Sequence, residues 1–210
     1  MKENTSSEKI ILGLSVAHHD GAACIVKGGK ILVAIECERL TKIKKDDLTD
    51  SNIKETLDYV LEAVGMELED IDYIAMGNAP ENCVGNEVSV GENVCGLGKD
   101  GFLIPHHLAH NAAAYYTSPF DNAISLSVDC SSGVPQFYHE NSSICLAEGN
   151  KIKSIETPPI SCGVYYQRVC EYLGIGSPLH KVGTLMGLAP YGKPISNTYF
   201  DLEEDYEITN

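Results

Sequence analysis

Three histidines occur within five positions in the stretch PHHLAHNAAAYY, which begins at Pro105. The alanines that follow favour a helix, and on a helix His106 and His110 lie on one face, one turn apart. Two imidazoles at this spacing can bind one metal ion. An H-x-x-x-H pair also occurs among ordinary surface and core histidines, so the spacing alone leaves both interpretations open.

A carboxylate that could join these imidazoles is Asp129, which follows the apolar run from Ala123 to Val128. Such a run is typical of a buried strand, and α/β sheets present functional groups at the carboxyl ends of their strands. Two histidines with one carboxylate suit non-haem iron(II), and zinc and manganese are the alternatives. If the helix packs at that end of the sheet, His106, His110 and Asp129 are the candidate metal ligands, and the residues alone leave this site and an ordinary helix start as equal alternatives.

A second polar cluster, His18-His19-Asp20, separates the apolar runs from Ile10 to Ala17 and from Gly21 to Lys27. Such a corner can bring a carboxylate and backbone N–H groups to a phosphate or a metal. It can also be a surface turn in which His and Asp serve the turn itself, and the residues alone favour this second interpretation.

The first part of the chain has the pattern of a layered α/β domain. Gly28-Gly29 predicts a hairpin turn from the second apolar run into a third strand, Lys30 to Glu36. Asn52 with Glu55 predicts the N-cap of an amphipathic helix that ends at Gly65, and the strand-like stretch from Ile71 to Met76 follows.

The rest of the chain starts with a stretch from Gly77 to Asp100 that has no clear period, so we expect a long loop that covers a site. A hairpin through Ile144 to Ala147 and Lys151 to Ile155 is predicted after Asp129, and then a helix from Gly163 to Leu173. The order of strands and helices predicts an α/β domain with a new unit beginning near Asn122.

Composition excludes several classes of protein. The formal charge of −15 and the presence of only two arginines, Arg39 and Arg168, argue against a nucleic-acid partner. No apolar run is long enough to span a bilayer, and the polar first residues do not resemble a signal peptide. The eight cysteines contain no C-x-x-C pair, which is typical of reduced core thiols, so a cytoplasmic protein is expected.

Several short motifs in order resemble those of the carbamoyltransferase family, which includes nodulation-factor, aminoglycoside and cephalosporin O-carbamoyltransferases. Each motif alone is weak, but together they extend over nearly the whole chain. They are His18 to Ala23, Glu36 to Thr41, Pro105 to His110, Ser118 to Phe120, Ser127 to Asp129 and Met186 to Gly192. The resemblance is imperfect at Cys130, which stands where the family usually has glycine.

The resemblance implies an actin/hexokinase-like (RNase H-like) α/β domain, similar to the tRNA threonylcarbamoyl-transfer protein. The chain would hold its first half and the start of its second half. We expect a first subdomain over residues 1–121, the start of a second over 122–194, and an irregular acidic tail over 195–210. The remaining half, as further chain or as a separate partner, would be needed for turnover.

The function implied by the family is ATP-dependent O-carbamoyl transfer. Carbamoyl phosphate and ATP give carbamoyl-adenylate, from which the carbamoyl group passes to a hydroxyl of a small-molecule acceptor. The motifs match His106, His110 and Asp129 to the family's metal ligands, with a further aspartate expected from a later segment.

The other implied site residues are His19 and Asp20 for acid–base or acceptor work, and Arg39, Gly187 and Gly192 for binding a cofactor or an anionic group. For Arg39 a solvated strand end is an equal alternative, and for the two glycines a helix-ending turn. The alternative function is a non-catalytic or split module of the actin-like ATPase superfamily that binds a metal or a nucleotide.

Overall fold

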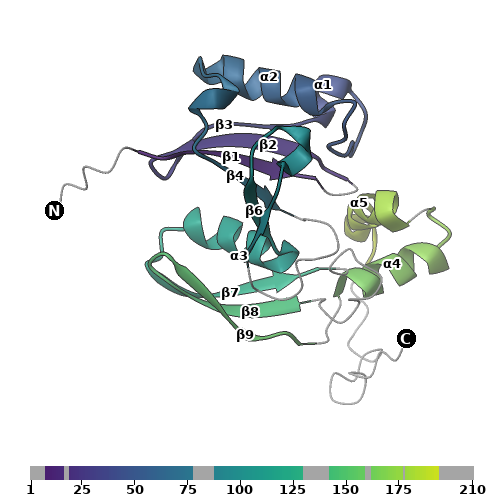
Figure 1. Cartoon of the computed structure of the whole chain (residues 1–210). Coiled ribbons are helices and arrows are strands. Elements are labelled where there is room, and N and C mark those ends of the chain that lie inside the picture. Colours follow the sequence, from purple (N-terminus) through teal and green to yellow (C-terminus); the bar gives the residue numbers. More distant parts are fainter. Residues whose placement is uncertain are drawn as a thin grey trace. The chain divides into compact units, whose positions relative to one another are not determined.

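The computed structural model describes residues 8–16, 19–77, 88–129, 142–158, 162–176 and 178–193 (Figure 1). The chain divides into two compact units, Met1–Phe120 and Asp121–Asn210. The expected acidic tail over 195–210 and Cys130 lie outside the described residues. Within the described part, no helix is both long and apolar enough to cross a membrane.

The first unit is built on a six-stranded sheet with the order β3-β2-β1-β4-β6-β5. Neighbouring strands β1, β2 and β3 are antiparallel, whereas β4 and β6 run parallel to β1. An antiparallel meander beside parallel strands is the arrangement of one RNase H-like half of an actin/hexokinase-like domain, so the predicted fold class is confirmed. The strands are β1 (Ile10–Ser15), β2 (Ala22–Lys27), β3 (Lys30–Glu36), β4 (Tyr73–Gly77), β5 (Ser89–Gly91) and β6 (Gly101–Ile104).

Helix α2 (Ile53–Val64) lies over one face of this sheet, beside the short helix α1 (Glu38–Thr41) (Figure 1). Its buried Leu57 and Val60 belong to the same hydrophobic core as the strand residues Leu12, Ile25 and Ile74. The fully buried side chains of these strand residues fix which face of each strand points towards α2, because side chains alternate across a strand.

Glycines end two elements where the sequence predicts. Gly28 and Gly29 have φ values of 56° and 77°, the left-handed conformation that a two-residue hairpin needs at both central positions. Gly65 follows α2 with φ 66°, and its N–H donates to the carbonyls of both Glu62 and Leu61. The predicted hairpin and helix end are therefore confirmed.

Asn52 is the N-cap residue of α2, as predicted, but its side chain has another role. The Asn52 side chain makes no capping hydrogen bond to α2. Its Oδ1 instead accepts from the Thr49 N–H at 2.8 Å, and its Nδ2 donates to the Asp47 carbonyl at 2.8 Å. The preceding loop uses this side chain, so α2 begins without it.

The stretch predicted as one long loop contains two regular elements in its described part, β5 and the 3₁₀ turn Val94–Gly96. The next strand, β6, and helix α1 were not predicted. Each has only four residues, which is too short to show a hydrophobic period. Residues 78–87 lie outside the described part, so the expectation that this segment covers a site stays untested.

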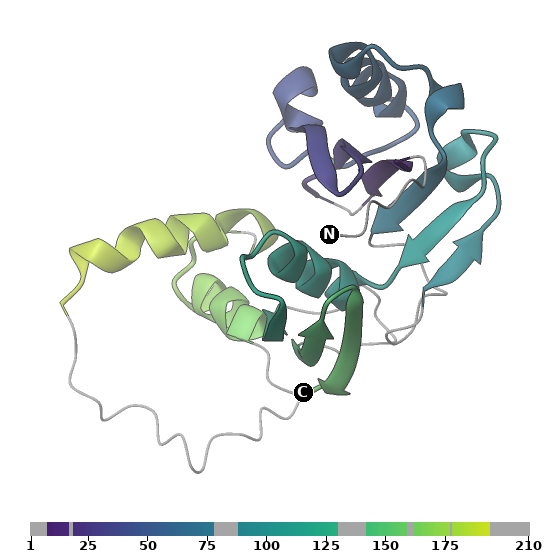
Figure 2. The same ribbon diagram turned by 90° about the vertical axis from the view of Figure 1, so that its left-hand side faces the viewer.

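The second unit contains a three-stranded antiparallel sheet with the order β7-β8-β9. Its strands are β7 (Asn122–Val128), β8 (Ser142–Glu148) and β9 (Lys151–Glu156). Helix α4 (Cys162–Tyr172) packs against α5 (Pro178–Leu188) (Figure 2), and the 3₁₀ turn Ala189–Tyr191 follows. The predicted hairpin and the helix near Gly163 are confirmed, and α5 was not predicted.

Strand β7 has an unusual distribution of side chains. Ser125 and Ser127 are buried, whereas Ile124 and Leu126 on the opposite face are 63% and 61% exposed. The larger apolar side chains would normally occupy the buried face. This face of the second sheet is therefore the one that lacks a packing partner among the described residues.

The described cysteines are all free thiols: Cys24, Cys37, Cys95, Cys145, Cys162 and Cys170. Cys37, Cys145 and Cys170 are fully buried. The prediction of core cysteines is confirmed for these three, whereas Cys24 and Cys95 are partly buried and Cys162 is exposed.

Candidate active site

The parallel strands β1, β4 and β6 end side by side. Ser15, the last residue of β1, pairs with Gly77 of β4, and Gly77 pairs with Ile104, the last residue of β6. Whatever follows β1 and β6 therefore leaves the sheet at the same edge, two strands or about 10 Å apart. The polar corner with His19 and Asp20 follows β1, and the histidine helix follows β6.

Helix α3 (His106–Tyr116) begins one residue after β6, with Pro105 between them. The fixed φ of Pro105, −54°, suits a helix start, and its carbonyl accepts from the Ala109 N–H at 2.9 Å. A Cβ at Gly77 would lie 3.6 Å from the Ala109 Cβ, so α3 passes close over the end of β4. These contacts place the first turn of α3 at the sheet edge.

Two neighbouring faces of α3 have different environments. His107, Asn111 and Tyr115, each four residues apart, are buried. His106 is partly exposed and His110 is exposed. Residues four positions apart share a face of the helix. His107 therefore belongs to the buried face, and His106 and His110 form a pair beside it.

The side chains of this pair converge. Their Nε2 atoms are 3.2 Å apart, and their rings lie edge to face with centroids 4.6 Å apart. Two nitrogens each about 2.1 Å from one ion and this far apart would subtend roughly 100° at it, between octahedral and tetrahedral angles. The pair therefore fits two ligand positions of a first-row divalent metal.

Asp129 directly follows β7 and is partly buried. The predicted position at the carboxyl end of a strand is confirmed. Asp129 belongs to the second unit, whereas both histidines belong to the first, and its role as the third ligand stays a prediction.

The corner after β1 contains a hydrogen-bonded acid–base pair. The His19 Nδ1 lies 2.7 Å from the Asp20 Oδ2, and both side chains are partly exposed. A carboxylate can only accept, so Nδ1 carries the hydrogen and the lone pair of the neutral ring is on Nε2. His18 lies outside the described residues.

The segment 43–48 supports this corner through backbone hydrogen bonds. The Gly21 N–H donates to the Asp46 carbonyl at 2.8 Å, and the Asp20 N–H donates to the Lys45 carbonyl at 3.4 Å. Asp20 itself has φ 57°, a left-handed conformation that Asp tolerates better than most residues. These hydrogen bonds thus support the left-handed backbone of Asp20. In this conformation its carboxylate contacts His19.

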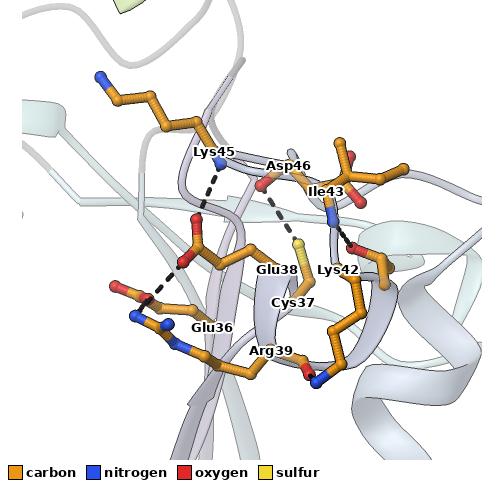
Figure 3. Close-up of polar contacts among 9 residues, drawn as sticks. Glu36, Cys37, Glu38, Arg39, Lys42, Ile43, Lys45 and Asp46 are labelled. Carbon is orange, nitrogen blue, oxygen red and sulfur yellow. Dashed lines mark hydrogen bonds and ion pairs between the residues drawn. The ribbon is translucent and has the colours of Figure 1, made fainter.

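Arg39, the predicted anion-binding residue, is paired with two carboxylates. Its Nη2 lies 3.2 Å from Glu36 and 3.3 Å from Glu38, and Glu38 also accepts from the Lys45 N–H at 2.8 Å (Figure 3). An anionic ligand would compete with these carboxylates. The contacts favour a role for Arg39 in ordering the turn after β3.

The two glycines predicted to approach a ligand lie in the second unit. Gly187 is inside α5, and no described atom lies within 4 Å of a Cβ built there. Gly192 is extended, with φ −81°. Neither backbone requires glycine for its conformation, and binding of a cofactor near them stays a prediction.

Sequence reasoning missed the role of segment 43–48, because its contacts run through backbone carbonyls. The side chains that contact these carbonyls, Cys37 and Asn52, stand 16 and 31 positions after Gly21 in the sequence. No spacing rule connects them. The only local signal was Gly21 itself, next to a polar corner.

The sequence of this chain matches the family described as carbamoyltransferase N-terminus, over residues 10–87 and 93–209. The match covers the corner after β1, the histidine pair on α3 and Asp129. The chain belongs to this carbamoyltransferase family.

Two curated relatives are similar over most of the chain. The nodulation protein NolNO of Sinorhizobium fredii is 30% identical over 216 residues, which are 90% of this chain and 30% of that protein. An uncharacterized protein of Synechocystis sp. is 29% identical over 245 residues, 93% of this chain and 37% of that protein. The chain thus spans about a third of the length of the curated relatives it matches.

Two solved structures resemble the chain loosely. YeaZ from Pseudomonas aeruginosa superposes with a TM-score of 0.40 and 10% identity, covering 71% of this chain and 68% of YeaZ. A putative N-acetylglucosamine kinase from Porphyromonas gingivalis gives a TM-score of 0.42 and 15% identity, covering 86% and 71%.

The close approach of segment 43–48 to Gly21 predicts that Gly21→Ala is strongly destabilising. A Cβ at Gly21 would lie 2.2 Å from the Leu48 nitrogen and 2.6 Å from the Asp47 carbonyl carbon. We expect a loss of about 3 kcal/mol in the free energy of unfolding, measured by urea denaturation. Gly183→Ala is the control, because it is in a helix with open space around its Cβ, and it should stabilise by no more than about 1 kcal/mol. Wild-type stability of Gly21→Ala would contradict the packing described.

Proposed function

We propose that this chain is the N-terminal part of an ATP-dependent O-carbamoyltransferase. Its substrate would be carbamoyl-adenylate, made from carbamoyl phosphate and ATP, and its acceptor the hydroxyl of a small molecule. Family membership supports carbamoyl transfer in general. The observation that carries the proposal is the common edge of β1, β4 and β6, from which both the His19–Asp20 pair and the His106–His110 pair emerge.

His19 and Asp20 supply the acid–base part of the proposal. An alcohol is a poor nucleophile at neutral pH, so its proton must be removed as the bond to the carbamoyl carbon forms. The contact between His19 Nδ1 and Asp20 leaves Nε2 as the atom that accepts this proton. Asp20 orients the ring and stabilises its charged form, as an aspartate does behind a catalytic histidine.

His106, His110 and Asp129 are the residues that would hold a divalent metal, with iron(II) expected first and zinc or manganese as alternatives. The converging Nε2 atoms on α3 support the two histidine ligands, and the position of Asp129 after β7 supports the carboxylate. When bound, the ion would polarise an oxygen of the carbamoyl group or of the acceptor.

We propose that the second unit binds a further polypeptide segment. Ile124 and Leu126 of β7 are exposed on one face of its sheet, and their cross-strand partners Leu146 and Ile144 of β8 are partly exposed. The curated relatives continue for about twice the length matched here. We propose that a segment of this continuation packs its own apolar side chains on this face.

The metal site predicts that His106→Ala, His110→Ala and Asp129→Ala each lower bound metal to background. Elemental analysis of anaerobically purified protein is the measurement, and near-stoichiometric iron or zinc is expected in the wild type. His19→Ala is the control and should keep its metal. Wild-type metal content in His110→Ala would rule out the site. A metal-free wild type would favour the alternative of a non-catalytic module.

The acid–base proposal predicts that His19→Gln, made in the longer protein, lowers kcat about 10²- to 10⁴-fold with a small change in KM. The assay is mass spectrometry of carbamoylated acceptor after incubation with carbamoyl phosphate and ATP. Arg168→Gln is the control, because Arg168 is exposed and pairs with Glu171 on the surface of α4. Unchanged kcat in His19→Gln would exclude His19 as the base.

The exposed sheet face predicts that the double variant Ile124→Lys, Leu126→Lys abolishes binding of the separately produced C-terminal remainder. Binding is measured by co-purification and by titration calorimetry. The unfolding transition of the chain alone should be unchanged, because both side chains are already exposed. Ile31→Lys is a matched control on β3, at 60% exposure. Equal loss of binding in the control would contradict a specific docking face.

A further inference from the structure

The carbonyls of Asp46 and Asp47 each accept hydrogen bonds from two directions. The Asp46 carbonyl accepts from the Gly21 N–H at 2.8 Å and from the Cys37 thiol at 3.2 Å. The Asp47 carbonyl accepts from the same thiol at 3.3 Å and from the Asn52 Nδ2 at 2.8 Å. A continuous set of contacts therefore runs from the start of α2, through Cys37, to the backbone beside Asp20.

Cys37 is well suited to this position. It is fully buried between β3 and α1, where its thiol contacts the Asp46 carbonyl (Figure 3), and its own N–H donates to the Gly21 carbonyl at 2.8 Å. Burial, and then the nearby charges of Asp46 and Asp47, raise the pKa of the thiol. Cys37 therefore keeps the hydrogen that it donates, and it contacts Gly21 from one side while contacting the Asp46 carbonyl from the other.

Asn52 fixes the other end of the segment. It is 7% exposed, its Nδ2 also lies 3.3 Å from the Asp46 carboxylate, and its Oδ1 accepts from the Thr49 N–H. The departure of Asn52 from helix capping, described above, is explained by these contacts. A buried amide with both ends occupied holds one rotamer.

We propose that Cys37 and Asn52 are positioning residues for the His19–Asp20 pair, acting through the carbonyls of segment 43–48. This inference rests on the proposed function for one point, which is that the His19–Asp20 pair acts as acid and base. The left-handed backbone of Asp20 is unfavourable for most residues, so it needs support from its surroundings. Loss of the Cys37 thiol loosens the Asp46 carbonyl directly, and loss of the Asn52 donor loosens the adjoining Asp47 carbonyl. The Asp20 carboxylate then leaves the His19 Nδ1.

Three variants and a control separate this role from general stability. Cys37→Ala removes the thiol, and Cys37→Ser restores a donor at the same site. Asn52→Asp keeps the shape and the Oδ1 acceptor but removes the Nδ2 donor. Cys145→Ala is the control, because Cys145 is an equally buried thiol in β8 of the other unit.

The measurements are amide hydrogen exchange at Gly21 and the tautomer of His19 by ¹⁵N NMR, both on the whole 210-residue chain. In Cys37→Ala and Asn52→Asp we expect Gly21 exchange to accelerate about 5- to 10-fold, with unchanged exchange in β1. We expect the Nδ1–H tautomer to lose its excess over Nε2–H. Cys37→Ser should restore both readouts towards wild type, and Cys145→Ala should leave both unchanged.

Several outcomes would overturn the inference. Unchanged Gly21 exchange and His19 tautomer in a folded Cys37→Ala and in Asn52→Asp would show that the contacts do not position the corner. Uniformly faster exchange throughout β1 and β2 would show a role in stability alone. Neither readout depends on turnover, so a failure of His19→Gln to reduce activity would overturn the proposed base while leaving the positioning role intact.

Discussion

The in-register parallel pairing of β1, β4 and β6 is the constraint on which the candidate site depends. Hydrogen bonds between these strands set Ser15, Gly77 and Ile104 in one row, so the chain leaves the sheet at one edge. A shift of one residue in either pairing would turn the core residues of that strand towards the opposite face. The buried side chains of Leu12, Leu14, Ile74 and Met76 thus fix the register, and with it the common exit of the polar corner and the histidine helix.

The same edge shows two ways of fixing a functional side chain. His106 and His110 are carried by a helix, whose own hydrogen bonds set their spacing. Asp20 lies in a turn, and neighbouring parts of the fold must supply the hydrogen bonds that a helix would provide internally. This difference explains why the corner is surrounded by buried polar contacts from Cys37 and Asn52, whereas the histidine pair needs only the packing of α3.

Sequence reasoning succeeded where a period or a turn residue was visible. It identified β3, the Gly28-Gly29 hairpin, the end of α2 at Gly65 and the start of α3 after Pro105. It placed His106 and His110 together because four residues make about one helical turn. It failed for α1 and β6, which are too short for a pattern. It also failed for the side-chain contacts of Asn52, whose neighbours in sequence resemble a capping box. It also failed for the contacts of segment 43–48, because any residue type supplies a carbonyl. The role of Asp129 as a third metal ligand stays a prediction, because Asp129 lies in the second unit and both histidines lie in the first.

The arrangement of side chains on β7 has a consequence during synthesis. A ribosome adds roughly 5 to 20 residues per second, so a face that is covered only by later residues stays exposed to water for many seconds. Ile124 and Leu126 would meanwhile be available to other nascent chains and to chaperones. The lysines and glutamates of the hairpin that follows, Glu148, Lys151, Lys153 and Glu156, place charge around this face. Such flanking charges oppose edge-to-edge association, so they protect the sheet for as long as this face is exposed.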